Sequence, residues 1–162
     1  MSRWIATVFG VGYLRPAPGT WGSIAALPLA WAVLMAGGAW LLVALTIAVT
    51  LLGYWATVKE TQGQDNHDPS EIVVDEVAGQ WIALLPVAYG AELMQTSYLA
   101  LWPGWLAALL FFRFFDIQKP WLVGWADKRN DAVGVMLDDL IAGAFAAAVV
   151  VLLAALAHGA LA

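Results

Sequence analysis

Long apolar runs alternate with short polar segments along most of the chain. Gly37 and Gly38 separate the first run from the second, and the first is short for a complete membrane crossing. Polar segments at 59–71 and 116–133 are predicted loops. The apolar runs predict helices at about Trp21–Met35, Ala39–Val58, Ile72–Tyr89, Tyr98–Phe115 and Gly134–Ala157.

This pattern places most polar segments on one side of the predicted bundle. We assume that successive helices cross the membrane in alternating directions. The same side then holds the end of the second helix, the starts of the third and fifth, and the end of the fourth. Every lysine and arginine lies on this side or at its border, so the positive-inside rule predicts that it faces the cytoplasm. These cations are Arg3, Arg15, Lys59, Arg113, Lys119, Lys128 and Arg129.

The composition supports a membrane protein. Hydrophobic residues make up 62% of the 162 residues, charged residues only 12%, and the mean hydropathy is +0.78. The absence of cysteine excludes disulfides and cysteine nucleophiles, and a net charge of −5 without a basic patch gives no sign of a nucleic-acid partner. We predict an all-α, polytopic membrane helical bundle of about four to five hydrophobic helices, forming a single domain over residues 1–162. The segment before Arg15 is interpreted as an amphipathic or re-entrant start.

Nearly all carboxylates fall on the same side as the cations, with Glu92 as the exception. Carboxylates in a partly desolvated place repel one another, and a divalent cation such as Mg²⁺, Ca²⁺ or Mn²⁺ removes that cost. Acids in a first helical turn also complement the helix dipole, which is the simpler explanation for any one of them. Two adjacent pairs that open two different helices favour a metal site. The acids concerned are Asp68, Glu71, Asp75, Glu76, Asp116, Asp138 and Asp139.

Other residues on this side suit a phosphate. Lys119 follows Asp116 by one turn in "FDIQKP", and Arg113 offers a bidentate fork, although either side chain could also extend toward anionic lipid heads. Thr20 and Ser23 in "PAPGTWGS" lie at the start of an apolar helix, where free backbone N–H groups attract anions. Ordinary helix capping explains the presence of these two residues equally well. His67 is a candidate base or ligand, or a plain loop histidine.

With these residues identified, the chain resembles the phosphatidylglycerophosphatase A family. The resemblance covers nearly the full length, and the motifs occur in the family's order at similar spacing. Two loop positions depart from the family pattern, since Leu122-Val123 replaces Pro-Ile and Asp131-Ala132 replaces glycines. The matching motifs are "PAPGTWGS" (16–23), "HDPSEIVVDEVAGQW" (67–81), "FRFFDIQKPW" (112–121) and "VGVMLDDLIAG" (133–143).

The resemblance implies a Mg²⁺-dependent phosphatase of the bacterial inner membrane that converts phosphatidylglycerophosphate into phosphatidylglycerol and inorganic phosphate. We expect Lys119, Arg113, Thr20 and Ser23 to contact the substrate phosphate, and one carboxylate or His67 to accept a proton from the attacking water. The family's acids carry over onto Asp68, Asp75, Glu76, Asp116, Asp138 and Asp139, and all of these except Asp68 form the expected Mg²⁺ ligand set.

Three other functions were weighed against this one. A divalent-cation transporter or channel would place acids near the middle of its helices, whereas here they lie at helix ends. A CDP-alcohol phosphotransferase would carry a "DGxxAR" opening, which the sequence lacks. A bundle that only binds anionic lipid would have no use for clustered acids. The transporter or channel is the strongest alternative. Oligomeric state is not predicted.

Overall fold

The computed structural model describes residues 1–63 and 69–159, so His67 and Asp68 lie outside the described residues. All regular elements within these ranges are helical, which confirms the predicted all-α class. They are α1 (Ser2–Ala6), η1 (Val11–Tyr13), α2 (Pro18–Thr61), α3 (Val74–Leu93), η2 (Tyr98–Leu101), α4 (Trp102–Gln118), α5 (Leu122–Asp127) and α6 (Ala132–Gly159).

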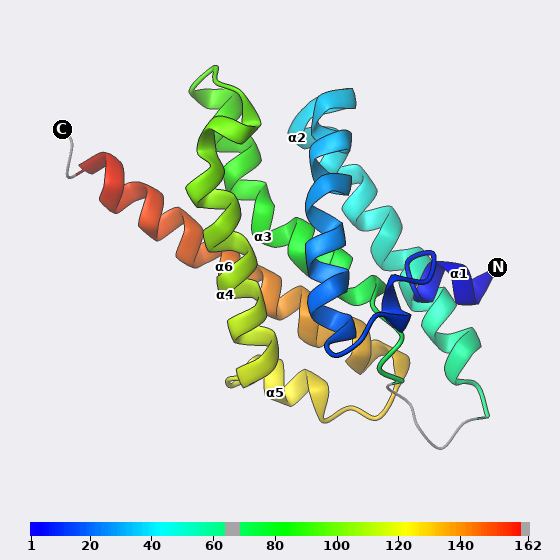
Figure 1. Ribbon diagram of the computed structural model, residues 1–162. Coiled ribbons are helices and arrows are strands. Elements are labelled where there is room, and N and C mark those ends of the chain that lie inside the picture. Colours follow the sequence, from blue (N-terminus) through cyan, green and yellow to red (C-terminus); the bar gives the residue numbers. More distant parts are fainter. Residues whose placement is uncertain (64–68, 160–162) are drawn as a thin grey trace.

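α2 is a helical hairpin rather than one straight helix (Figure 1). Gly37 and Gly38 have non-helical backbone angles, and the positive φ of 71° at Gly38 is one that glycine adopts without strain. The predicted break is therefore confirmed. The first arm begins at Pro18, earlier than expected, and its 18–36 span is about 28 Å long. That length is close to the ~30 Å of a bilayer's hydrocarbon core.

The hairpin tip is held by a side chain from α3. Oε1 of Glu92 accepts hydrogen bonds from the backbone N–H of Ala39, at 2.6 Å, and from the hydroxyl of Tyr98, at 2.9 Å. Ala39 opens the second arm, where backbone N–H groups have no partner within the helix. Glu92, the one acid expected away from the others, thus caps the restarted helix at the end of the bundle opposite α5 (Figure 1).

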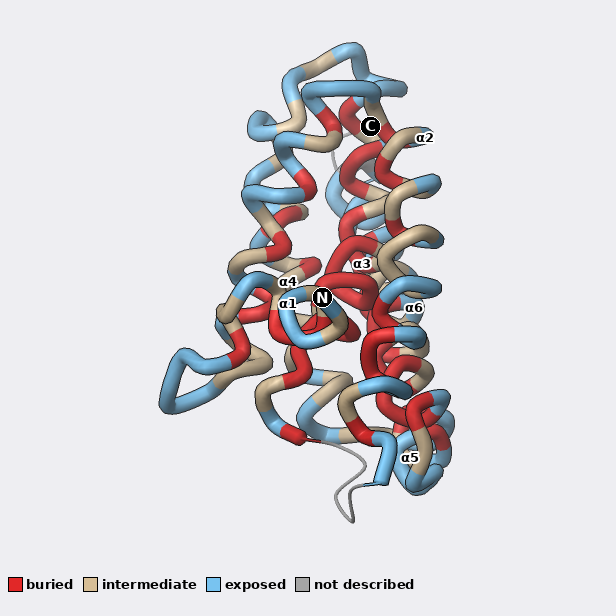
Figure 2. Tube along the Cα trace, turned by 90° about the vertical axis from the view of Figure 1, so that its right-hand side faces the viewer, coloured by how far each residue is buried: buried red, intermediate tan, exposed pale blue. Residues whose placement is uncertain are grey.

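α3 lies at the centre, and the other long helices cover it. Buried backbone gathers along α3 and on the inward sides of its neighbours, whose outer sides are exposed (Figure 2). α3 and α6 approach closely, because a Cβ on Gly143 would collide with the backbone of Gly79, and a Cβ on Gly79 would lie 2.5 Å from the carbonyl oxygen of Asp139. Two glycines thus set the distance between these two helices.

Within the part of the chain that the structure describes, three segments are long and apolar enough to cross a membrane: Pro18–Thr61, Tyr98–Gln118 and Ala132–Ala157. Their outward-facing side chains include many large exposed hydrophobic groups, which is typical of surfaces in contact with lipid. α3 is not among them, and it carries Asp75, Glu76 and Glu92. The chain is a membrane protein whose central helix is shielded by more apolar ones.

The predicted loop at 116–133 is wrong in two respects. α4 continues through Gln118, so Asp116 lies in its last turn, where it is paired with Arg113 one turn earlier. α5 then forms a further short helix, and Asp131 begins α6 by accepting a hydrogen bond from Gly134 N at 2.8 Å. Lys119 ends α4 in the left-handed conformation just before Pro120.

A carboxylate-lined cavity as candidate active site

Three helix ends bring the predicted acids together. Asp75 and Glu76 lie in the first turn of α3, Asp116 in the last turn of α4, and Asp138 and Asp139 near the start of α6. These five carboxylates line one cavity of about 250 Å³. The cavity is also lined by Arg113, Lys119 and Ser70, and by the segment Ala17–Gly19 at the start of α2.

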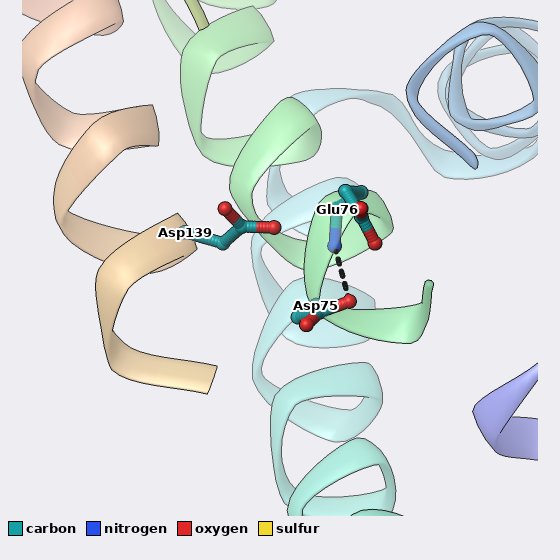
Figure 3. Close-up of side chains that lie close together, drawn as sticks. All are labelled: Asp75, Glu76 and Asp139. Carbon is teal, nitrogen blue, oxygen red and sulfur yellow. Dashed lines mark hydrogen bonds between the residues drawn. The ribbon is translucent and has the colours of Figure 1, made fainter. Parts of the chain in front are cut away.

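The carboxylates form two groups that share Asp139. One group is Asp75, Glu76 and Asp139, and the other is Asp116, Asp138 and Asp139. Within each group, one potential ligand atom from each residue lies within 4.8 Å of the others. Asp139 projects from α6 toward the start of α3, where Asp75 and Glu76 lie (Figure 3). The arrangement can therefore hold a cation on either side of Asp139.

Several of these acids are buried, which is costly for a charged group without compensation. Asp139 is only 3% exposed, and Asp75 and Asp138 are each 6% exposed. Backbone N–H groups supply part of the compensation: Oδ1 of Asp75 accepts from Glu76 N, and Oδ1 of Asp138 accepts from Asp139 N, both at 3.0 Å. Asp75 and Asp138 are thus hydrogen-bonded to backbone, and Asp75 also lies in the first turn of α3, where the helix dipole favours negative charge.

Arg113 joins three helices at the edge of the cavity. Its Nη1 lies 2.6 Å from Oδ2 of Asp116 and 4.0 Å from Oε1 of Glu76, and it donates to Oγ of Ser23 at 3.4 Å. Gly19 lies against the same group, since a Cβ there would collide with Oε1 of Glu76. A larger residue at this point of α2 would therefore displace the Glu76 carboxylate from its position beside Arg113.

Lys119 closes the other side of the cavity. Its Nζ lies 3.0 Å from Oδ2 of Asp138 and also pairs with Asp127 of α5. Burial lowers the pKa of the Lys119 ammonium, but the hydrogen bond to Asp127 and the charge of Asp138 outweigh it and raise the pKa above its ordinary value. Lys119 is therefore positively charged at neutral pH, and it lines the cavity while paired with both carboxylates.

The five acids and two cations of this cavity lie in a stretch of sequence that matches a known family. A family model described as Phosphatidylglycerophosphatase A matches residues 4–154. The chain belongs to the phosphatidylglycerophosphatase A family. The resemblance inferred from the sequence motifs is thereby confirmed.

Relatives of similar length support this membership. Proteins named Phosphatidylglycerophosphatase A are 37% identical in Haemophilus influenzae and 31% identical in Escherichia coli, each over 147 residues and 90% of this chain. The match covers 84% of the first relative and 78% of the second. A Bacteroides thetaiotaomicron protein, provisionally named a phosphatidylinositol-3-phosphatase, is 36% identical over 147 residues, 87% of this chain and 86% of that one. No solved structure matches the chain.

Not every residue expected to serve a phosphatidylglycerophosphatase A site faces the cavity. Ser23 is fully buried and donates to the carbonyl of Gly19 at 2.9 Å, so it contacts Arg113 rather than the cavity itself. Thr20 is in the first turn of α2 and does not line the cavity. From "PAPGTWGS", it is the backbone around Gly19 that lines the cavity, not the two hydroxyl groups.

This phosphatidylglycerophosphatase A family member also has site residues whose roles the sequence did not predict. Ser70 lines the cavity, and Asp127 pairs with Lys119 from a segment expected to be loop. The close approach of Gly19 to Glu76 was not predicted either. A glycine between a proline and a helix start was the available signal for Gly19, but its meaning depends on Glu76, which is distant in sequence.

Proposed function

We propose that the chain hydrolyses the terminal phosphate of phosphatidylglycerophosphate, releasing phosphatidylglycerol and inorganic phosphate. Members of its family are phosphatases that act on phosphate monoesters, and the chain is such an enzyme. The observation that carries the proposal is the single cavity in which five carboxylates face Arg113 and Lys119. A phosphomonoester is a ligand that fixed positive charges and a carboxylate-held metal ion can bind together.

Mg²⁺ is the proposed cofactor, and the donor set fits it. Among the residues that the structure describes, all candidate ligands are carboxylate oxygens, which Mg²⁺ prefers, and the cavity leaves room beside them for water and phosphate. When bound, Mg²⁺ would neutralise negative charge on the phosphate and make a coordinated water more acidic. We propose that it is held by Asp75, Glu76, Asp116, Asp138 and Asp139.

The chain's own residues then account for binding and proton transfer. Lys119 and Arg113 are placed to contact the phosphate oxygens, whose charge is spread in the loose transition state of phosphoryl transfer. A carboxylate of the cavity, or His67, accepts a proton from the attacking water as its oxygen bonds to phosphorus. The bond from phosphorus to the glycerol oxygen breaks, and that oxygen takes up a proton as phosphatidylglycerol leaves.

We further propose that the chain lies in the bacterial inner membrane with this cavity at the cytoplasmic face. The cavity is at the helix ends near α5, where Lys119, Lys128 and Arg129 also lie, as the positive-inside rule requires of a cytoplasmic side. A lipid headgroup in the inner leaflet would reach the cavity without leaving the membrane surface.

The deciding experiment is phosphate release by the purified protein in detergent micelles. Phosphatidylglycerophosphate, phosphatidylinositol 3-phosphate and phosphatidic acid would be compared at equal surface concentration, each with Mg²⁺ and with excess EDTA. We expect Mg²⁺-dependent release that is fastest from phosphatidylglycerophosphate. Faster release from either other lipid would reassign the substrate. No release from any lipid by folded protein would reject the phosphatase and favour the cation transporter, which cation flux in liposomes then tests.

A further inference from the structure

Gln80, in the first half of α3, is a buried polar residue to which no role has been assigned above. Its side chain has no exposed surface, and neither its Oε1 nor its Nε2 has a hydrogen-bond partner among the residues that the structure describes. A buried amide without partners is costly, and an apolar side chain of the same size would avoid that cost. The position of an amide here therefore needs a functional explanation.

Two further buried atoms nearby are in the same condition. Oε2 of Glu76 and Nε of Arg113 have no hydrogen-bond partner within the described ranges, although Oε1 of Glu76 lies 4.0 Å from Nη1 of Arg113. Gln80 follows Glu76 by one turn of α3, so the two share a helix face. Because helical side chains lean toward the N-terminus, we expect the long side chain of Gln80 to lie over the turn that carries Glu76.

The unpartnered atoms are complementary. An amide offers an oxygen that accepts and an N–H₂ group that donates. Arg113 Nε–H needs an acceptor and Oε2 of Glu76 needs a donor, which are the two functions that Gln80 supplies. We propose that Gln80 bridges Arg113 and Glu76 through one water molecule, and is a positioning residue that orients the Glu76 carboxylate toward Asp75 and Asp139.

The bridge is tested without reference to activity. Gln80→Met removes the amide at nearly constant size, and Leu84→Met, one turn further along the same buried face, is the matched control. Unfolding would be followed in detergent with EDTA present. If Gln80 bridges two buried polar atoms, Gln80→Met lowers the unfolding temperature by a few degrees more than Leu84→Met does, because both atoms lose their partner. An unfolding temperature equal to or above that of the wild type overturns the bridge.

The positioning role rests on the proposed function and needs a second readout. With saturating Mg²⁺, Gln80→Met should lower kcat roughly tenfold or more, while KM for the lipid stays within about twofold. The reason is that the substitution misplaces the carboxylate of Glu76, which is proposed to bind the metal, and leaves the contacts with the lipid unchanged. Leu84→Met should leave kcat near wild type. An unchanged kcat overturns the positioning role even if the unfolding temperature falls.

Two complications are covered by this design. If the wild-type protein releases no phosphate, the proposed function fails while the unfolding comparison still decides whether the bridge exists. If Gln80→Met does not fold, Gln80→Glu replaces it, because it keeps the length and an acceptor for Arg113 but loses the amide donor to Glu76. The same two criteria then apply.

Discussion

At the scale of single residues, Asp139 has the most connected position in the cavity. It is common to both carboxylate groups, and its backbone carbonyl also lies where α3 and α6 are closest. The other acids each belong to one group, and three of them are paired with cations: Glu76 and Asp116 with Arg113, and Asp138 with Lys119. Loss of one charge at Asp139 therefore affects both potential cation positions at once.

We predict that Asp139→Asn lowers turnover by ~10²-fold or more, because one neutral amide replaces the carboxylate that both groups share. Phosphate release at saturating Mg²⁺ measures this, and metal binding by titration with Mn²⁺ should weaken in parallel. Asp131→Asn is the matched control, since Asp131 is an acid on the same side that caps α6 outside the cavity and asparagine caps nearly as well. Near-normal turnover in Asp139→Asn would contradict the carboxylate mechanism.

At the scale of secondary-structure elements, the site depends on how closely α3 and α6 pack. We predict that Gly143→Ala destabilises the protein by about 1–3 kcal/mol and lowers turnover, because the added methyl group pushes Gly79 and α3 away from Asp139. Detergent unfolding and phosphate release measure the two effects. Gly90→Ala in α3 is the control, since its added Cβ would meet only Leu101 at 3.7 Å. If Gly143→Ala behaved like Gly90→Ala, the glycine contact would not position the site.

The sequence predicts elements well where a single run of residues determines them. Apolar runs reveal the long helices, and the Gly37-Gly38 pair reveals the hairpin break, because both signals are local. The end of α4 was misplaced because the polar residues there look like loop, whereas Asp116 is held in the helix by Arg113. α5 is too short to give a periodic signal of its own.

For the cavity, too, the sequence predicts what local signals determine and misses what depends on contacts between distant segments. The convergence of Asp75, Glu76, Asp138 and Asp139 follows from alternating helices and from acids at helix starts. The sequence could not predict that Thr20 and Ser23 do not line the cavity. Their position depends on which side of α2 faces Glu76, and these two segments are far apart in the chain. The buried amide of Gln80 is likewise invisible in a sequence, where a glutamine normally indicates a polar surface.

At the scale of the whole molecule, the two ends of the bundle differ in chemistry. The end near α5 holds the cavity and the nearby cations, and the opposite end holds the hairpin tip and its Glu92 cap. We predict that reporters fused after Met94 and at the C-terminus report a periplasmic position, and that one inserted after Lys128 reports a cytoplasmic one. Paired reporters, one active on each side of the membrane, measure this. A cytoplasmic signal at Met94 would contradict the proposed orientation.

The burial of α3 also bears on how the protein is made. α3 leaves the ribosome before α4 and α6, the helices that later cover it, and its first turn carries Asp75 and Glu76. Acidic side chains are costly in lipid without protein around them. The apolar hairpin of α2 can insert by itself, whereas α3 is expected to wait at the translocation machinery or the bilayer surface until α6 has been synthesised. Completion of the carboxylate cavity and membrane integration of its central helix would then be a single late step of biosynthesis.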